Sequence, residues 1–510
     1  MSNASALFRS LLIYGLCLPL AVFLGYLLAT PMDFTTVTVV GIVLGVLAIP
    51  ALLRWHHLWL IATWNMTVML FFVPGHPQVW MGLAVASLAI SILQYTLNRR
   101  MKPLSVPSVA WPLLFLTVVI LITARLTGGI GVRILGGDTH GGKRYIVMLA
   151  AIIGYFAIIN RQIPPKHAGR YVALFFLGGT TMAIANLPGV INPAFNFLFF
   201  LFPVEDPGVL MREHDVVGPT AFISRVTGLA LTSIAVFCAM LARYGIRGIL
   251  DTTKPWRLLV FGFFCLVGLL GGYRSVVVQF VMVLALLFYL ERLHHTRMLL
   301  PTVFGLLAGG FLLVLFASRL PFPIQRSLAI FPFIPLDPGA RLSAQASSDW
   351  RVQVWQDVVP QIPQYLLIGK GYSFSVKEQE DLGKGLEGTE LVGDYHNGPL
   401  SVLLPFGIFG SIAFVWLMIA GIRALHQNYQ FGDPAYHDIN TFLFAYFVAK
   451  VVFFFTVFGS LHSDLPVFLG LLALGISLNG GVAKPVVVPQ PKIVFNRFKL
   501  HPSSRRPAGA

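Results

Sequence analysis

The chain has 510 residues, of which 56% are hydrophobic and only 11% are charged, and its mean hydropathy is +0.78. Soluble domains carry about 25% charged residues, so this composition excludes an ordinary soluble protein. The net charge of +16 fits either the cationic cytoplasmic loops of a membrane protein or an affinity for lipid phosphates and diphosphates.

Apolar runs of about 20 residues, the length that crosses a hydrocarbon core of roughly 30 Å, follow one another along the chain. No small-residue cleavage pattern follows the first run, which therefore predicts a spanning helix rather than a cleaved leader. The expected fold is an all-α polytopic membrane protein with about 12–14 transmembrane helices. The predicted helices are 11–29, 35–53, 57–73, 78–97, 108–124, 144–160, 170–187, 220–242, 256–271, 273–290, 298–317, 397–422, 439–458 and 464–479.

The distribution of Lys and Arg among the short loops predicts the orientation. Basic residues gather in alternate loops, as at 99–102 and 243–257, whereas the turns at 74–77 and 459–463 contain none. Cytoplasmic loops carry the excess of positive charge, so both termini are expected in the cytoplasm and the protein in the bacterial inner membrane. The pair His56-His57 falls in a predicted cytoplasmic loop and is expected to be solvated.

This pattern divides the chain into four parts. Residues 1–317 are expected to hold transmembrane helices 1–11, residues 318–396 a large periplasmic loop that covers a site, and residues 397–483 the last transmembrane helices. Residues 484–510 are basic and rich in Pro, and are expected to be disordered. Within the loop, one of residues 347–349 can cap a helix that Pro360 stops, although the alternation at 350–355 would also suit a strand.

Three arginines and one histidine are expected to meet at the outer side of the membrane. Arg225 and Arg274 lie at the outer ends of predicted helices, Arg351 lies in the large loop, and His396 ends that loop. Arginine is always charged and donates in a planar fork that suits a diphosphate. A neutral histidine can accept a proton at ambient pH. On a helix Trp355 shares a face with Arg351, so its indole is expected to stack on the guanidinium.

Asp394, Tyr395 and Asn397 flank His396 and are candidates for positioning it. Each of these sites also has a purely structural alternative, because arginines at helix ends often extend to the interface and a histidine can cap a helix. Lys450, His462 and Asp464 lie in or beside apolar runs near the outer face, and the sequence leaves their roles open.

The sequence offers no sign of a metal or cofactor. No pair of carboxylates has the spacing of a glycosidase or a metal site, and no nucleotide-binding loop is present. Cys17, Cys238 and Cys265 lie far apart in apolar runs and suggest neither a disulfide framework nor metal ligands. We therefore expect no metal, no cofactor and no nucleic-acid partner.

Four segments, taken with their order and spacing, resemble the O-antigen ligase and polymerase-related family of bacterial membrane glycosyltransferases. They are Arg225-Val226-Thr227-Gly228; Tyr273-Arg274-Ser275; Arg351-x-x-x-Trp355 with Pro363 and Gly369-Lys370-Gly371; and His396-Asn397 with Leu400 and Phe406-Gly407-Ile408-Phe409-Gly410. The resemblance covers roughly residues 215–425. It departs from the family at Tyr273, where Ser or Thr is usual, and after Gly228, where a Pro-Asn pair is missing.

The resemblance implies an inverting, metal-independent transfer of a glycan from a polyprenyl-diphosphate donor to a hydroxyl of a lipid-anchored acceptor. Arg274 and Arg351, helped by Arg225, would hold the diphosphate, and His396 would act as base or orient the acceptor. A polymerase of the same family, which passes the glycan to another lipid-linked unit, remains an alternative. A lipid or polysaccharide transporter is a third possibility, but its pseudo-symmetric halves and midplane polar residues are not evident. The expected partners are the lipid-linked donor, the acceptor and membrane lipids.

Overall fold

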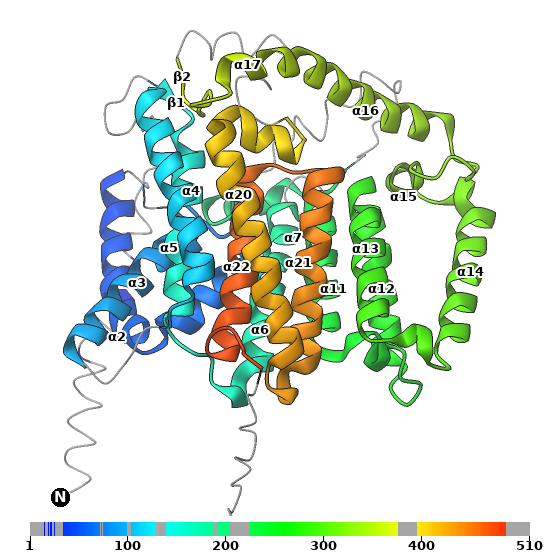
Figure 1. Cartoon of the computed structure of the whole chain (residues 1–510), viewed down its shortest axis with the longest axis horizontal. Coiled ribbons are helices and arrows are strands. Elements are labelled where there is room, and N and C mark those ends of the chain that lie inside the picture. Colours follow the sequence, from blue (N-terminus) through cyan, green and yellow to red (C-terminus); the bar gives the residue numbers. More distant parts are fainter. Residues whose placement is uncertain are drawn as a thin grey trace, which may run out of the picture.

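The protein is a bundle of roughly parallel and antiparallel helices with one long helix, α16, lying across one end of it, as the computed structural model shows (Figure 1). The structure describes residues 34–71, 73, 75–98, 104–128, 130, 139–187, 192–203, 225–375 and 395–485, together with a few isolated residues of 15–25. Within this part, ten helices are long and apolar enough to cross a membrane, and two shorter apolar helices accompany them. The predicted all-α polytopic fold is confirmed.

The described helices follow one another in the order expected from the apolar runs. The spanning and short α-helices are α2 (Phe34–Thr63), α3 (Val79–Leu97), α4 (Pro107–Leu126), α5 (Gly142–Ile159), α6 (Ala168–Leu177), α7 (Thr181–Ala185), α11 (Thr227–Ile249), α12 (Trp256–Leu270), α13 (Arg274–Leu290), α14 (Leu299–Phe316), α15 (Phe322–Leu328), α16 (Pro338–Val358), α17 (Ile362–Tyr365), α20 (Gly398–Phe431), α21 (His437–Thr456) and α22 (Leu461–Asn479). Two-residue strands, β1 (Thr139–His140) and β2 (Phe374–Ser375), pair antiparallel at the same end of the bundle as α16 (Figure 1).

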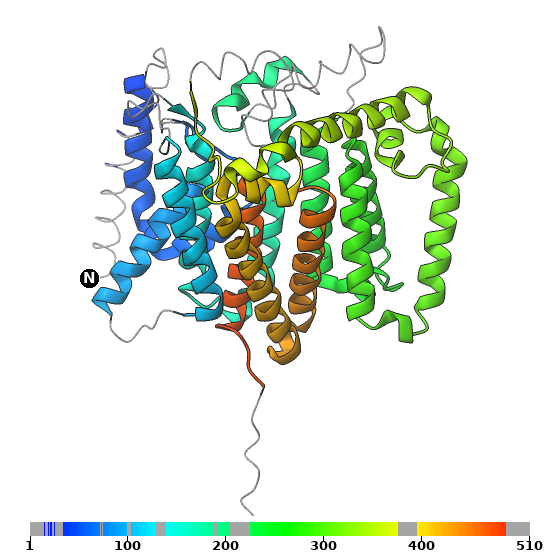
Figure 2. The same cartoon turned by 45° about the horizontal axis from the view of Figure 1, so that its top comes forward.

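The core of the bundle forms around α5, α11, α20, α21 and α22, and most of the buried hydrophobic residues of these helices belong to one large apolar cluster. In contrast, no residue of α14 is buried, and this helix stands at the edge of the molecule (Figure 1). α22 ends at the face opposite α16, as both views show (Figure 2). The large loop and the end of the last helix thus lie on opposite faces of the bundle.

The first described helix differs from the prediction. The sequence suggested two helices, 35–53 and 57–73, joined by a cytoplasmic loop at Arg54, but α2 continues without a break to Thr63. His56 and His57 are buried rather than solvated, because Nδ1 of His56 lies 2.7 Å from the Ser87 hydroxyl on α3 and Nε2 of His57 lies 2.9 Å from the Ile158 carbonyl on α5. These polar contacts hold the segment inside the bundle. The predicted first span, 11–29, lies largely outside the described residues.

The predicted helix in the large loop is present but begins about three turns earlier than expected. α16 starts at Pro338, where the side chain of Asp337 accepts a hydrogen bond from the Gly339 amide at 2.7 Å. Proline at the first position of a helix loses no hydrogen bond, and Asp is a favoured cap, so this start is more stable than one at residues 347–349. The residues proposed as caps instead lie in the middle of α16.

We expect α16 to face the periplasm and the turn between α20 and α21 to face the cytoplasm. In a variant without native cysteines, Gln345→Cys should react with a membrane-impermeant maleimide in intact spheroplasts, because Gln345 is exposed on α16. Ala435→Cys, exposed on the opposite side, should react only after permeabilisation. The reverse pattern would invert the orientation. The test is needed because Arg125, Lys143 and Arg144 lie at the ends of α4 and α5 that adjoin β1, so the charge asymmetry is not complete.

Candidate active site

The predicted arginines and histidine surround one cavity at the end of the bundle that α16 crosses. The cavity has a volume of about 350 Å³ and is lined by Arg225, Arg274, Arg351 and His396, which come from four separate parts of the chain. A fourth arginine, Arg326 of α15, also lines it and was not among the predicted site residues. None of the described residues around the cavity is Asp or Glu. The site is therefore suited to an anion.

Three serines of α16 receive hydrogen bonds from three of these arginines. Arg274 donates to Ser348 at 3.0 Å, and Arg225 donates to Ser347 at 3.3 Å. Ser343 lies one turn earlier and accepts a bond of 2.9 Å from Nε of Arg326, which is 3% exposed. Arg326 also donates from Nη1 to the Gly272 carbonyl at 3.1 Å. These bonds fix α16 across the bundle, with Arg351 further along the same helix.

The ring of Phe458 contacts both Arg351 and His396. The guanidinium carbon of Arg351 lies 5.8 Å from the centre of the Phe458 ring, and the His396 ring meets the same phenyl group edge-on at 5.2 Å. Trp350 contacts His396 in a second edge-on pair at 5.1 Å. The backbone of His396 has a φ of +51°, a conformation uncommon for residues other than glycine. The imidazole is thus held between two aromatic rings at the cavity wall.

The predicted stacking of Trp355 on Arg351 is wrong. The indole N–H of Trp355 donates instead to the Tyr395 carbonyl at 2.8 Å, and the ring packs in a cluster with Tyr395 and Val358. Arg351 and Trp355 are four residues apart on α16, as predicted. The indole N–H bonds to the Tyr395 carbonyl, however, because a guanidinium has no acceptor for it. Trp355 therefore anchors the residue next to His396 and leaves the place beside Arg351 to Phe458.

The neighbours of His396 have structural contacts. The side chain of Asn397 caps α20 by accepting a bond from the Leu400 amide at 3.1 Å, and Tyr395 is 2% exposed. Both fix the turn that carries His396 at the start of a spanning helix. Asp394, the other predicted supporting residue, lies outside the described residues.

Arg225 precedes its helix rather than lying inside it. The sequence predicted a helix from 220, but α11 begins at Thr227 because Val226 is extended and its amide donates to the Gly271 carbonyl at 3.1 Å. This bond ties Arg225 to the turn before Arg274. The ring of Tyr273 lies 5.7 Å from the Arg225 guanidinium, and its hydroxyl is 2.5 Å from that of Thr227. The residue that departs from the family pattern thus supports Arg225.

Gly228 of the Arg-x-x-Gly segment serves close packing. Its amide donates to the Asn186 side chain at 2.5 Å, and a Cβ at this position would lie only 2.6 Å from the Met182 carbonyl. A larger residue would push α11 away from α7, so this glycine sets the position of the segment that carries Arg225.

The glycine-containing segments Gly369-Lys370-Gly371 and Phe406-Gly407-Ile408-Phe409-Gly410 lie in parts of the chain that are hydrogen-bonded to each other. α20 is interrupted at Gly407, which has a φ of +63°, and the segment 366–371 bonds to the interrupted turn. The amides of Lys370 and Gly371 donate to the carbonyls of Leu404 and Pro405 at 2.7 and 3.0 Å. A Cβ on Gly407 would lie 2.6 Å from the Leu367 carbonyl. Glycine permits both the positive φ and the close approach. The two segments therefore hold residues 366–371 of the large loop against α20.

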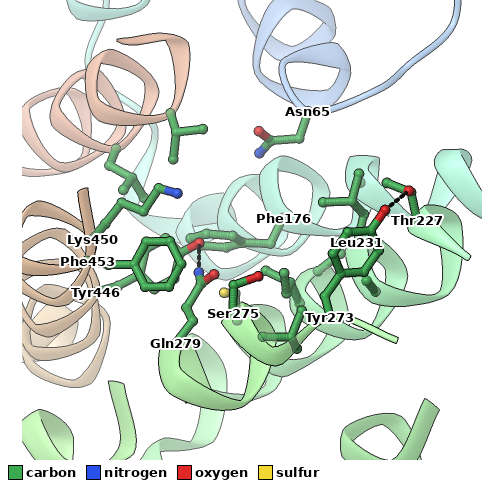
Figure 3. Close-up of a pocket in the computed structure, with 18 of the residues that line it drawn as sticks. Asn65, Phe176, Thr227, Leu231, Tyr273, Ser275, Gln279, Tyr446, Lys450 and Phe453 are labelled. Carbon is green, nitrogen blue, oxygen red and sulfur yellow. Dashed lines mark hydrogen bonds between the residues drawn. The ribbon is translucent and has the colours of Figure 1, made fainter. Parts of the chain in front are cut away.

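A second cavity lies beside the arginine cavity and has a volume of about 370 Å³. Tyr273, Ser275 and Phe458 line both cavities. Most of its other walls are apolar, but Lys450 and Gln279 project into it (Figure 3). The sequence left the role of Lys450 open. In the structure its ammonium lies 2.8 Å from a carboxylate oxygen of Asp464, in a pair that is almost buried.

The positive charges around the arginine cavity repel one another. Arg274 is about half buried, and the nearby positive charge of Arg225 repels its own. Burial removes water from these guanidinium groups, and the serine hydroxyls that they meet are neutral. A bound anion would offset both the repulsion and the lost hydration.

Sequence reasoning missed Arg326, Phe458 and the three serines. Arg326 lies in a Pro-rich stretch of the large loop, and the only signal was a basic residue in a segment that was expected to be periplasmic. Phe458 ends an apolar run and has no sequence feature that distinguishes it from other lipid-facing or core aromatics. Ser347 and Ser348 were predicted only as possible helix caps, and Ser343 was given no role in the site.

A family model described as O-antigen ligase matches residues 258–415. The segment that matches the O-antigen ligase domain contains most of α12, all of α13 to α17 and the first half of α20, and with them Arg274, Arg326, Arg351 and His396. The match supports the predicted resemblance to an O-antigen ligase and polymerase-related family. Comparison with curated proteins found no match.

The O-antigen ligase domain and the apolar helices together identify a multi-pass membrane protein of glycan synthesis. Two cavity residues lie outside the matched segment. Arg225 directly precedes α11, and Phe458 lies in the turn between α21 and α22. The arginine cavity is thus built by the O-antigen ligase domain together with the helices on either side of it.

Proposed function

We propose that the protein is a membrane glycosyltransferase of the ligase type, which moves a glycan from a polyprenyl-diphosphate donor to a hydroxyl of a lipid-anchored acceptor. One observation carries the proposal: four arginines and a histidine line a single cavity at the outer end of the bundle, and no described lining residue is a carboxylate. A polymerase would use the same donor chemistry with a second lipid-linked glycan as acceptor.

Arg274 and Arg351 hold the diphosphate in this proposal, with help from Arg225. Their guanidinium groups approach the cavity from α13, from α16 and from the segment before α11, so the two phosphates meet donors from different sides. Charge builds up on the diphosphate as the bond to the sugar breaks, and fixed cations stabilise that charge without rearranging. Arg326 is more deeply buried and bonds to Ser343 and to a main-chain carbonyl, which suits it to holding α16 in place.

His396 acts on the acceptor. The acceptor hydroxyl attacks the anomeric carbon from the side opposite the diphosphate, and its proton passes to the imidazole of His396. The bond between the anomeric carbon and the diphosphate oxygen breaks, and the diphosphate leaves with the electron pair. The configuration at the anomeric carbon is therefore inverted. No metal is needed, because the arginines supply the positive charge.

The large loop, residues 318–396, covers the site in this proposal. α15 and α16 belong to it, and both contribute walls of the cavity. The orientation that follows puts the loop in the periplasm, both termini in the cytoplasm, and the chain in the inner membrane of a bacterium.

The arginines and the histidine should differ in their effects on binding and on transfer. Arg274→Ala and Arg351→Ala should weaken donor binding, because a charge-assisted hydrogen bond is worth about 1.5–3 kcal/mol, or roughly one to two decades in affinity. Arg351→Lys should be nearly as harmful, since an ammonium lacks the planar fork. His396→Ala should keep donor binding and slow transfer by roughly two to four decades. Binding of a lipid-diphosphate donor and single-turnover transfer are measured together.

Arg341→Ala is the matched control for these variants. Arg341 also lies on α16, but its guanidinium donates to the carbonyls of Pro332 and Ile334, and it is not among the residues that line the cavity. It should leave donor binding near that of the wild type. Wild-type transfer by His396→Ala, or wild-type donor affinity in both alanine variants of the arginines, would contradict the assigned roles.

Transfer should not depend on a divalent metal. The purified protein should keep its rate after treatment with EDTA, because guanidinium groups rather than a bound cation are proposed to stabilise the leaving diphosphate. The measurement is the rate of transfer with EDTA, and again after Mg²⁺ or Mn²⁺ is restored. Loss of activity with EDTA and its recovery with either ion would show that the metal-independent mechanism is wrong.

A further inference from the structure

The turn between α21 and α22 brings Phe458 to the cavity, and several bonds fix it. The amides of Val457 and Phe458 donate to the Phe453 carbonyl at 2.9 and 3.1 Å. Gly459 packs directly on Gly398, two residues after His396, and a Cβ on Gly459 would lie 2.7 Å from the Gly398 Cα. The Leu461 amide donates to the Ser401 hydroxyl at 3.1 Å. The turns that carry Phe458 and His396 are therefore packed together.

A buried ion pair ties this turn to the helices on both sides of it. One carboxylate oxygen of Asp464, in the first turn of α22, lies 2.8 Å from Nζ of Lys450 on α21. The other accepts a hydrogen bond of 2.9 Å from the Ser460 amide. Both side chains are about nine-tenths buried. The Lys450 ammonium also lies 5.1 Å from the centre of the Phe453 ring, whose own carbonyl accepts from the turn.

We infer that Lys450 and Asp464 are positioning residues that act on His396 and Arg351 through Phe458. Burying two charges costs free energy that a well-packed apolar pair would avoid, so a buried pair is poor evidence for a role in stability alone. Here one carboxylate oxygen of Asp464 accepts a hydrogen bond from the turn that carries Phe458, and the other pairs with Lys450 on the helix before that turn. That ring contacts the imidazole and lies under the guanidinium. Of the two residues, only Lys450 lines the second cavity, and neither lines the arginine cavity.

The inference rests on the proposed function for its catalytic consequence, but the position of His396 can be measured without substrate. Diethyl pyrocarbonate modifies exposed imidazoles, and the rate at His396 is followed by mass spectrometry of the purified protein. The main variant is Lys450→Met with Asp464→Ala, which removes the tether and leaves no unpaired buried charge. Lys450→Met with Asp464→Asn keeps an acceptor for the Ser460 amide.

Modification of His396 should be several-fold faster in the methionine–alanine variant than in the wild type, and intermediate in the methionine–asparagine variant. Transfer should fall by roughly tenfold to a hundredfold in the first variant, because small displacements of catalytic groups have effects of that size. Donor binding through Arg274 and Arg225 should change less than transfer. Phe458→Leu should produce the same faster modification, and combining it with the methionine–alanine variant should add little.

Asn479→Ala is the matched control, because Asn479 and Asn440 join the same two helices at the opposite end. Their side chains exchange hydrogen bonds of 3.0 and 2.8 Å. Loss of this link should loosen α21 from α22 but leave modification of His396 and transfer near wild type. If it had the same effect as loss of the ion pair, general loosening rather than positioning would be responsible, and the inference would be wrong.

The outcomes separate this inference from the proposed function. Wild-type protection of His396 in the folded methionine–alanine variant overturns the inference, and the methionine–asparagine variant decides in the same way if the first does not fold. Simple addition of the effects of Phe458→Leu and of the ion-pair variant would also overturn it. If the wild type neither binds a lipid diphosphate nor transfers a glycan, the proposed function fails, whereas a change in His396 protection still supports the positioning role.

Discussion

Hydrogen bonds between arginines and the serines of α16 are the interaction on which the rest of the site depends. Arg225, Arg274 and Arg326 belong to separate elements, yet each donates to a serine on one stretch of a single helix. These bonds set the height and the register of α16 over the membrane helices. Once α16 is fixed, Arg351 faces the cavity, and the Trp355 indole reaches the carbonyl beside His396. A shift of α16 by one residue would separate all of these contacts.

The site concentrates positive charge where water is partly excluded, and this determines what it can bind. Serine hydroxyls accept hydrogen bonds from Arg225, Arg274 and Arg326 but carry no charge, and none of the described residues that line the cavity is a carboxylate, so the cavity is suited to an anion. The rings of Trp350 and Phe458 confine the imidazole of His396 in edge-on contacts. In the proposed function, the cations bind the donor and the confined imidazole faces the acceptor, so the two substrates have separate places. The ion pair beneath Phe458 extends this arrangement into the membrane helices.

The sequence predicted the helical fold and the convergence of Arg225, Arg274, Arg351 and His396, because apolar length and loop position are local properties. It could not predict contacts that depend on how helices dock. The stacking of Trp355 on Arg351 was wrong because a carbonyl from a distant segment competes for the indole. Arg326 and Phe458 were missed because nothing local marks them, and α2 was divided at Arg54 because the polar partners of His56 and His57 lie on other helices. Lys450 was noticed, but only the fold shows that Asp464 is its partner.

The most direct test of the account is a structure of the purified protein bound to a polyprenyl diphosphate, determined by electron cryomicroscopy. The account predicts that the diphosphate lies in the arginine cavity, with phosphate oxygens within hydrogen-bonding distance of Arg274 and Arg351 and with the imidazole of His396 facing the acceptor side. A diphosphate bound elsewhere, for example near the basic residues Arg243 and Arg257 at the opposite face, would contradict the central claim.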